Sequence, residues 1–429
     1  MKKIKLGDVL DVRRGASLAG EYYSEQGNLI RLTLGNFNYP RGGFQDNTSK
    51  KNIYFVGSVN PAFILKTGDI ITPLTEQVSG LLGETATIPE SGKYVQSGDI
   101  GLVIPDETKI DKRFAYYLVS SPVVRKQLDA AAQQTKIRHT SPDAIKACEA
   151  WIPENISTQR SIGKLLDALD EKIALNKKIN ATLESMAKTL YDYWFVQFDF
   201  PDENGKPYKT SGGKMIYSSE LGRDIPAGWE RGKLSKLIKS VTTGLNPRDN
   251  FILNTGGNIK YVTVKNLTLE GRIDFSNCDC VNEDARNLIH ERSNISKGDV
   301  LFASISPLGR CFLIQENPYN WEINESVFSI RPSNFTTSEF LYMYLKSNSF
   351  VKLASSSSTG SIFKGIRINT LMETPTIIPP KNISEQFKSK LFKLLSKLNQ
   401  SNEESRRLAE LRDWLLPMLM NGQVDFKEI

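Results

Sequence analysis

The feature that most constrains this fold is an internal duplication. The heptapeptide PENISTQ at 153–159 recurs almost unchanged as PKNISEQ at 380–386, 227 residues further on. Three more pairs of similar segments precede it in the same order, with offsets between 226 and 230: IKLGDVLDV (4–12) with GKLSKLIKS (232–240), LKTGDIITPL (65–74) with ISKGDVLFAS (295–304), and RFAYYLVSS (113–121) with EFLYMYLKS (339–347). Four ordered matches at a nearly constant offset predict two copies of one structural unit.

A long amphipathic helix is predicted after each heptapeptide, because apolar residues recur there at spacings of three and four. Each stripe would span about 37 residues, or roughly 55 Å, and has the spacing of a coiled coil. Ser157 and Ser384 are predicted to cap the two helices. Equivalent stripe positions differ by 225, and the stripes consist of Ile162, Leu166, Leu169, Ile173, Leu183, Met186, Leu190 and Trp194, and of Phe387, Leu391, Leu394, Leu398, Leu408, Leu411, Leu415 and Leu419.

Both apolar stripes are interrupted near their midpoints, by Asn176 and Asn180 in the first and by Ser401 and Ser405 in the second. In an antiparallel pair the midpoints meet, so we expect these residues to face each other in a polar layer that fixes the register. A local solvent-exposed interruption is the alternative. The predicted seam of the helix pair comprises Ile162, Leu166, Leu169, Ile173, Asn176, Asn180, Leu183, Leu190, Leu391, Leu394, Leu398, Ser401, Ser405, Leu408 and Leu415.

The segments before the helices have a mixed α/β pattern, with short β-rich runs such as NLIRLTL and DVLFASI separated by Gly, Asn and Pro. We therefore expect α/β (α+β) domains in tandem duplication, joined by two long antiparallel coiled-coil helices with pseudo-two-fold symmetry. The expected order is a globule (1–155), a long helix (156–196), a linker rich in Gly, Pro and charge (197–226), a second globule (227–383) and a second long helix (384–422).

Charge points to a polyanionic partner. The formal net charge is +7, and residues 351–400 alone carry eight Lys or Arg against two Glu, a local net charge of +6. For Lys388–Lys397, a solvated helix face is the alternative. No stretch approaches 18 uninterrupted apolar residues and the start lacks an apolar signal core, so we expect a cytoplasmic chain with no membrane partner.

Motifs for catalysis are missing from the sequence. It contains only two histidines, His139 and His290, no G-x-x-x-x-G-K-[ST] loop, and four cysteines without zinc-ligand spacing. We therefore expect no catalytic residues, no metal site and no cofactor bound by this chain.

The duplicated order of globule and long helix resembles the specificity subunit of type I restriction–modification systems over essentially the whole chain. The resemblance rests on both P-x-N-I-S-x-Q heptapeptides, both heptad helices, IPAGWE at 225–230, and the segments that end each globule, QQTKIRHTSPDAIKACEAWIP and SSTGSIFKGIRINTLMETPTIIP. The aromatic run LYDYWFVQFDFP after the first helix departs from the pattern, and is predicted either to cap the helix pair or to contact a partner.

The resemblance implies a non-catalytic subunit whose globules are target recognition domains, each of which reads one half of a split site in double-stranded DNA. It implies that the helices act as a spacer and dock two methyltransferase (modification) subunits and restriction/translocase subunits. S-adenosylmethionine, ATP and Mg would then be bound by those partners. A coiled-coil protein-binding scaffold without DNA readout, and an enzyme with a hidden methyltransferase site, are the competing hypotheses.

Base reading by such domains requires Arg, Lys, Asn or Gln in the major groove, with other basic groups on phosphates. Candidates lie in Gly- or Ser-rich loops. Lys136 and Arg138 match Lys364 and Arg367, because both pairs follow a run of small residues. The full set of DNA-binding candidates is Arg13, Arg14, Arg31, Asn36, Arg41, Gln77, Lys136 and Arg138 in the first globule, and Thr243, Arg248, Lys265, Asn266, Arg310, Lys364 and Arg367 in the second.

Overall fold

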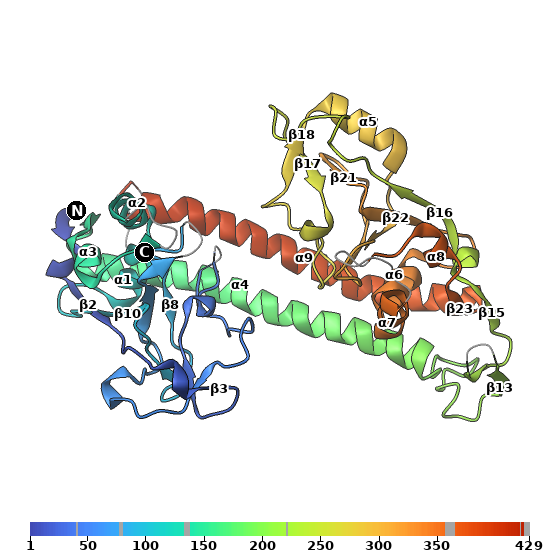
Figure 1. Cartoon of the computed structure of the whole chain (residues 1–429), viewed down its shortest axis with the longest axis horizontal. Coiled ribbons are helices and arrows are strands. Elements are labelled where there is room, and N and C mark those ends of the chain that lie inside the picture. The colour runs from blue at the N-terminus through green and yellow to red at the C-terminus, as the bar shows by residue number, and fades with distance from the viewer. Residues whose placement is uncertain are drawn as a thin grey trace. The chain divides into compact units, whose positions relative to one another are not determined.

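The computed structural model describes residues 1–39, 42–76, 80–132, 138–219, 222–356, 365–420 and 422–423. The chain divides into two compact units, one formed by Met1–Asn176 with Glu403–Ile429 and the other by Lys177–Asn402. The long helices α4 (Ile156–Tyr191) and α9 (Lys381–Met420) each contribute one half to each unit. Both stand out as the long coils in green and red (Figure 1).

The first globule is organised around an antiparallel sheet with the strand order β2-β10-β6-β8. Its inward positions are buried aliphatic residues such as Val12, Ile70 and Val103, which pack on the helices that follow. The strands of the globule are β1 (Lys2–Lys5), β2 (Leu10–Arg14), β3 (Tyr23–Ser24), β4 (Leu29–Arg31), β5 (Tyr54–Phe55), β6 (Ile70–Pro73), β7 (Thr75–Glu76), β8 (Ala86–Thr87), β9 (Tyr94–Val95), β10 (Ile100–Pro105), β11 (Arg138–His139) and β12 (Glu149–Ile152).

Short helices of the first globule begin at side-chain caps. Asp111, Ser121 and Ser141 each accept a backbone N–H from the first turn, which satisfies donors that a helix start leaves open. Pro follows the cap in two of them, where its fixed φ fits the first helical position. These helices are α1 (Lys112–Val119), α2 (Pro122–Ala131) and α3 (Pro142–Ala147).

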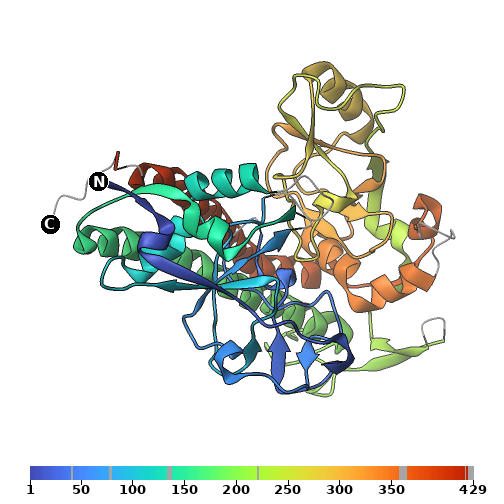
Figure 2. The ribbon, with the colours of Figure 1, turned by 60° about the vertical axis from the view of Figure 1, so that its left-hand side comes forward.

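The second globule repeats this architecture around a sheet with the strand order β16-β22-β19-β20. Helix α5 covers the sheet β18-β17-β21, at the end of the globule away from the long helices in both views (Figure 1, Figure 2). The strands are β15 (Glu230–Lys233), β16 (Ile238–Thr243), β17 (Ile259–Val262), β18 (Asp279–Val281), β19 (Val300–Ala303), β20 (Cys311–Leu313), β21 (Trp321–Ile323), β22 (Val327–Pro332) and β23 (Pro375–Ile378), and the helices are α5 (Glu283–Ser293), α6 (Ser338–Lys346), α7 (Asn348–Ser356) and α8 (Ile368–Met372).

The strand registers confirm the predicted duplication. Gly101 pairs with Arg14 across β10 and β2, and Ser329 pairs with Thr242 across β22 and β16. The residue numbers of both members of the pair differ by 228 between the two copies. The pair β1-β12, which ties the start of the first globule to its end, likewise recurs as β15-β23. The two globules therefore share a topology that their sequences only partly reveal.

The long helices run antiparallel within each unit, as predicted. In the first unit Asp170 of α4 binds Arg412 of α9 at 2.7 Å, and Asn176 binds Glu404 at 2.8 Å. The residue numbers of the partners on α9 therefore decrease as those on α4 increase, which is the order of an antiparallel pair. In the second unit Asn180 binds Asn402. Further along α4, the ring of Tyr191 lies 6.3 Å from that of Phe387.

The predicted helix caps were wrong. Asn155, not Ser157, caps α4, because its Oδ1 accepts the backbone N–H of Ser157 at 2.7 Å. Helix α9 begins at Lys381, so Ser384 lies inside the helix and is fully buried. Since the helices start 225 residues apart while the heptapeptides lie 227 apart, the second heptapeptide is two positions further into its helix.

The seam of the helix pair follows the predicted stripe with local exceptions. Ile162, Leu166, Leu391 and Leu398 are buried. Leu169, Ile173, Leu183, Leu190, Leu394, Leu408 and Leu415 are half-buried. Met186 and Leu411 were expected on the stripe but are 50% and 43% exposed.

The midpoints of both helices form polar contacts at the predicted level, where Asn176 and Asn180 of α4 meet residues 401–405 of α9. Asn176 Nδ2 donates to Glu404 Oε2, next to Ser405, and Asn180 Nδ2 donates to Asn402 Oδ1, next to Ser401, both at 2.8 Å. Asn176 and Asn180 are only 2% and 5% exposed, and Ser401 is buried, so the alternative of a solvent-exposed interruption is wrong.

The aromatic run after α4 caps the helix pair, one of its two predicted roles. A π-helical turn, η5 (Asp192–Val196), ends the helix and turns Phe195 inward, where its ring lies 4.9 Å from Phe387 of α9 and 4.7 Å from Phe340 of α6. Phe198 packs edge-on against Trp229. The segment that follows forms the hairpin β13 (Met215–Ser218) and β14 (Arg223–Pro226).

Candidate nucleic-acid interface

Equivalent turns in the two globules are built by the same Thr–Asn pair. Asn36 Oδ1 accepts the N–H of Thr33 at 2.9 Å, and Asn266 Oδ1 accepts the N–H of Thr263 at the same distance. The amide nitrogens donate to Gln45 O and Asp274 O, both at 3.2 Å. Asn36 and Asn266 are 1% and 2% exposed. Their predicted role in base reading is therefore corrected: these amides hold the turns η3 (Leu34–Asn36) and η7 (Val264–Asn266).

Arg31, another DNA-binding candidate, is also a structural residue. Its guanidinium carbon lies 3.9 Å from the ring centroid of Tyr23, and Nη2 donates to Asn52 O at 3.4 Å. The residue is 9% exposed, so a base or phosphate does not have access to most of its surface. Stacking on Tyr23 offsets part of the desolvation of the cation.

Arg138 and Arg310 are partly exposed and bound to neighbouring loops. Arg138 Nη1 forms ion pairs with Glu76 at 2.8 Å and Asp129 at 2.6 Å. The Asp129 carboxylate raises the pKa of the guanidinium, which stays charged. Arg310 Nη1 donates to Val264 O at 3.1 Å, which brings it beside Lys265. Both guanidinium groups stabilise neighbouring loops, and part of the surface of each residue remains accessible to solvent.

The remaining described candidates lie on exposed or half-exposed surface. Arg13 and Arg14 end strand β2, and Thr243 ends the equivalent strand β16. Arg13, Arg14, Arg248, Lys265 and Arg367 are exposed, and Thr243 is half-buried. Arg13 Nη2 donates to Ala62 O, and Lys265 Nζ lies 3.7 Å from Asp279 Oδ2. Arg41, Gln77, Lys136 and Lys364 lie outside the described residues.

Glu76 is a structural determinant that the sequence did not reveal. Its Oε2 accepts the backbone N–H groups of Gly80, Leu81 and Leu82 at 2.7–3.0 Å, while Oε1 pairs with Arg138. The side chain is 1% exposed, and a buried carboxylate requires such partners. Its only sequence signal was an acidic residue just after the apolar strand IITPL.

A Ser–His–Glu cluster in the second globule lacks the geometry of a catalytic triad. Ser293 Oγ donates to Glu322 Oε2 at 2.7 Å, and His290 Nδ1 lies 2.6 Å from Oε1 of the same carboxylate. Because both side chains bind the carboxylate, neither bond would activate the serine, which is itself fully buried. Burial raises the pKa of Glu322. Across the residues that the structure describes, no cluster of His, Cys, Asp and Glu is arranged to hold a metal ion.

The family model for the type I restriction modification DNA specificity domain matches residues 1–185 and 226–412, which is one match in each copy. The chain is 24% identical over 385 residues to the type I restriction enzyme HindI specificity subunit of Haemophilus influenzae, covering 77% of this chain and 81% of that protein. It is 24% identical over 332 residues to the MjaIX specificity subunit of Methanocaldococcus jannaschii, covering 76% and 72%.

The fold is similar to the crystal structure of the type I restriction–modification S subunit from M. genitalium. The TM-score is 0.59 at 16% sequence identity, and the alignment covers 99% of this chain and 96% of that one. The similarity extends over both globules and both long helices, so the tandem architecture is that of a known S subunit.

A duplicated α/β globule that alternates with long helices, and that matches a DNA specificity model in both copies, is typical of a DNA-recognition protein. The chain belongs to the family of type I restriction–modification DNA specificity domains. Its function is DNA sequence specificity, and it is not itself an enzyme. The protein-scaffold and hidden-methyltransferase hypotheses are therefore set aside. None of the described helices has the length and apolarity needed to cross a membrane.

Proposed function

We propose that the chain reads a bipartite site in double-stranded DNA, one half with each globule, for a type I restriction–modification complex. The observation that supports this proposal is the common strand topology combined with different residues at equivalent positions. Arg14 and Thr242, for example, occupy equivalent register positions on β2 and β16. Two readers with one framework and different side chains at the same places recognise half-sites that need not be palindromic.

Within each globule, the exposed cations make the DNA contacts. Arg13 and Arg14 serve the first globule, and Arg248, Lys265 and Arg367 serve the second, with Arg138, Arg310 and Thr243 in supporting positions. Arg is suited to bidentate binding of guanine, and any of these cations neutralises phosphates. Arg41, Gln77, Lys136 and Lys364 remain candidates on the basis of sequence.

The long helices also carry exposed apolar positions that repeat with the duplication. In the second unit, Met186, Leu190, Tyr193 and Leu394 line a shallow groove between α4 and α9. Met186 and Leu190 correspond, at the offset of 225, to Leu411 and Leu415 in the first unit.

Exposure at these equivalent positions supports a docking role. Met186 is 50% exposed and Leu411 43%, and Trp414 beside Leu411 is 58% exposed. Aromatic residues and Met are enriched in protein interfaces, and equivalent faces suit two copies of one partner. We assign one methyltransferase (modification) subunit to each face.

The partners supply the chemistry in this proposal. The modification subunits bind S-adenosylmethionine and methylate adenine, and restriction/translocase subunits bring ATP and Mg for cleavage. The chain itself acts in the cytoplasm without a cofactor, and the helices set the number of unread base pairs between the half-sites.

Methylome sequencing of the host with and without the gene tests the proposal. Deletion is expected to remove methylation from one split adenine motif, and a plasmid copy of the gene is expected to restore it. A plasmid copy with Arg14→Ala is expected to lower methylation at that motif, with the loss concentrated on one half-site. If deletion leaves every adenine motif methylated, the proposal is wrong.

A further inference from the structure

A loop of the second globule contacts the midpoint of the helix pair. The loop at 268–272 follows η7 and closes through Thr268 N–H to Arg272 O at 2.9 Å. Arg272 Nη1 donates to Asn402 Oδ1 of α9 at 3.2 Å. The same oxygen accepts Asn180 Nδ2 of α4 at 2.8 Å, so one carbonyl joins the recognition domain to both long helices. All of these residues belong to the second unit.

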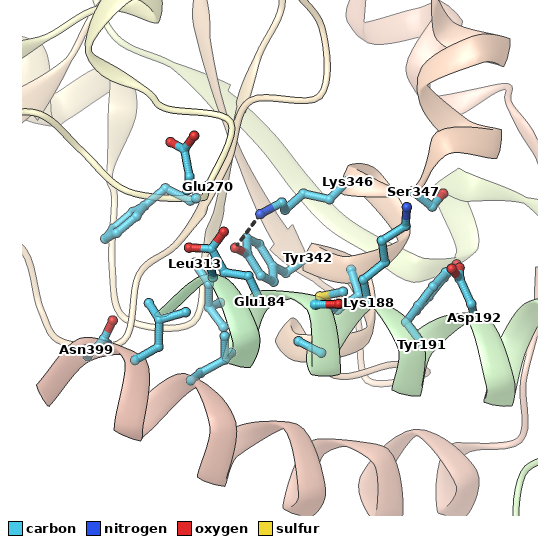
Figure 3. A pocket seen from close by; sticks show the side chains of 18 of the residues that line it. Glu184, Lys188, Tyr191, Asp192, Glu270, Leu313, Tyr342, Lys346, Ser347 and Asn399 are labelled. Atoms are coloured by element: carbon cyan, nitrogen blue, oxygen red, sulfur yellow. Dashed lines mark hydrogen bonds between the residues drawn. The ribbon is translucent and has the colours of Figure 1, made fainter. Parts of the chain in front are cut away.

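A cavity of about 400 Å³ lies beside this contact, between the globule and the helices. Glu184, Tyr342, Lys346 and Asn399 are among its lining residues, together with Glu270 of the loop (Figure 3). Lys346 Nζ donates to Tyr342 Oη at 3.3 Å across the opening. Because the space beside the loop is not filled by side chains, polar contacts of the loop contribute more to holding the globule than they would above a close-packed interface.

The backbone of the loop comes close to the cavity wall at Gly271. A Cβ built on Gly271 would lie 2.1 Å from Tyr342 Oη, and the residue has a φ of +88°. Only glycine fits such an approach without strain. The glycine thus allows the loop to lie near enough to the helices for Arg272 to reach Asn402.

In the first copy the equivalent loop spans 38–43, and its residues 40 and 41 lie outside the described part of the chain. The loop closes through Asn38 N–H to Gly43 O, so Gly43 occupies the place of Arg272. The equivalent of Asn402, at an offset of 225, is Lys177, which has no side-chain acceptor. Among the described residues, Gly43 therefore has no side-chain donor and Lys177 no side-chain acceptor to match Arg272 and Asn402.

We propose that Arg272 is a positioning residue that fixes the second recognition domain on the helix pair, and so makes recognition sensitive to the spacing between half-sites. This inference rests on the proposed function. One added base pair moves a half-site by about 3.4 Å and rotates it by roughly 35° about the duplex axis. A globule held at Asn402 resists that displacement, whereas a globule released from it can move into the unfilled space beside the loop.

The test measures methylation by the assembled complex on DNA with the native spacer and with spacers longer or shorter by one base pair. Arg272→Ala is expected to raise the relative rate on the altered spacers by about three- to tenfold, the effect of one lost hydrogen bond of a partly exposed side chain. Asn402→Ala is expected to do the same, and combining both changes is expected to add little. Arg272→Lys, which keeps a donor and the charge, is expected to restore part of the discrimination.

Arg292→Ala is the matched control, because it removes the same charge from an exposed position of α5 in the same globule. It is expected to leave spacer discrimination unchanged. A merely structural role for Arg272 would slow methylation on all spacers equally, and that result would overturn the inference. If the wild-type complex shows no bipartite site at all, the proposed function fails rather than this inference.

Discussion

The strongest test of the helix pair is removal of the cation at Arg412. Arg412 Nη1 pairs with Asp170 Oδ1 at 2.7 Å, and Tyr117 Oη donates to Asp170 Oδ2 at 2.8 Å. The side chain of Arg412 is 15% exposed and that of Asp170 is 32% exposed. The Asp170 and Asp413 carboxylates raise the pKa of Arg412 against the opposing effect of its desolvation, so the guanidinium remains charged.

Arg412→Met keeps most of the volume and leaves Asp170 without this cation. Breaking a fully buried ion pair costs about 3–5 kcal/mol, and the partial exposure of Asp170 lowers the expected cost to about 2 kcal/mol. Amide hydrogen exchange of the purified chain reports this locally, and protection of peptides from the first half of α4 and the second half of α9 is expected to fall by about 30-fold.

Two further variants make this experiment decisive. Arg407→Met removes an exposed arginine of the same helix, whose side chain is 73% exposed and pairs with Glu403, and is expected to change protection by less than about twofold. Asp170→Asn combined with Arg412→Met is expected to recover part of the loss, because the neutral amide no longer needs a cation. If Arg412→Met has no larger effect than Arg407→Met, the argument that this pair joins α4 to α9 is wrong.

Three other predictions concern docking, DNA binding and pH. Met186→Asp and Leu411→Asp are each expected to lower the number of bound modification subunits from two to one in native mass spectrometry, while Val56→Asp, at an equally exposed position of the first globule, leaves it at two. Charge reversal of Lys364 and Arg367 together is expected to weaken DNA binding of the assembled complex and to lower the slope of log affinity against log salt by about two or more; an unchanged slope argues against their contact with phosphates. Glu322→Gln is expected to flatten the pH dependence of stability. Burial raises the folded-state pKa of Glu322 above the ordinary 4.5, so the folded state holds more protons than the unfolded state. Wild-type stability is therefore lost as pH rises from 4.5 through the folded-state pKa. Urea unfolding across that pH range measures this. If the free energies of unfolding of wild type and variant fall in parallel as pH rises, the prediction is wrong.

Repetition made the architecture predictable. The heptapeptides, the shared offset and the apolar stripes predicted two globules and two antiparallel helices, because periodicity and duplication are properties of the sequence itself. The polar interruption at Asn176 and Asn180 likewise located the midpoint contact correctly. The sequence did not predict Glu404 and Asn402 as hydrogen-bond partners there, because helical phase, not sequence similarity, decides which side chains face each other.

The candidate site was less predictable, because the sequence does not distinguish a loop Asn or Arg that faces solvent from one whose side chain stabilises a turn. Asn36 and Asn266 were selected as base readers, but both are buried turn residues whose amide groups bind the backbone of their own turns. Arg31 was selected as a free cation, but it stacks on Tyr23. The exposed Arg14 had no distinguishing sequence pattern, whereas Arg367 was marked by the run of small residues before it.

By itself the sequence determined the duplication, the two long helices and their antiparallel pairing, since each depends on spacings that can be counted along the chain. Only the tertiary structure showed which polar side chains form hydrogen bonds within the protein. Examples are the carboxylate of Glu76, which binds backbone N–H groups, and Arg272, which binds Asn402. The physical reason is that a hydrogen bond joins residues brought together in space, here 130 positions apart for Arg272 and Asn402, and no local pattern records that meeting.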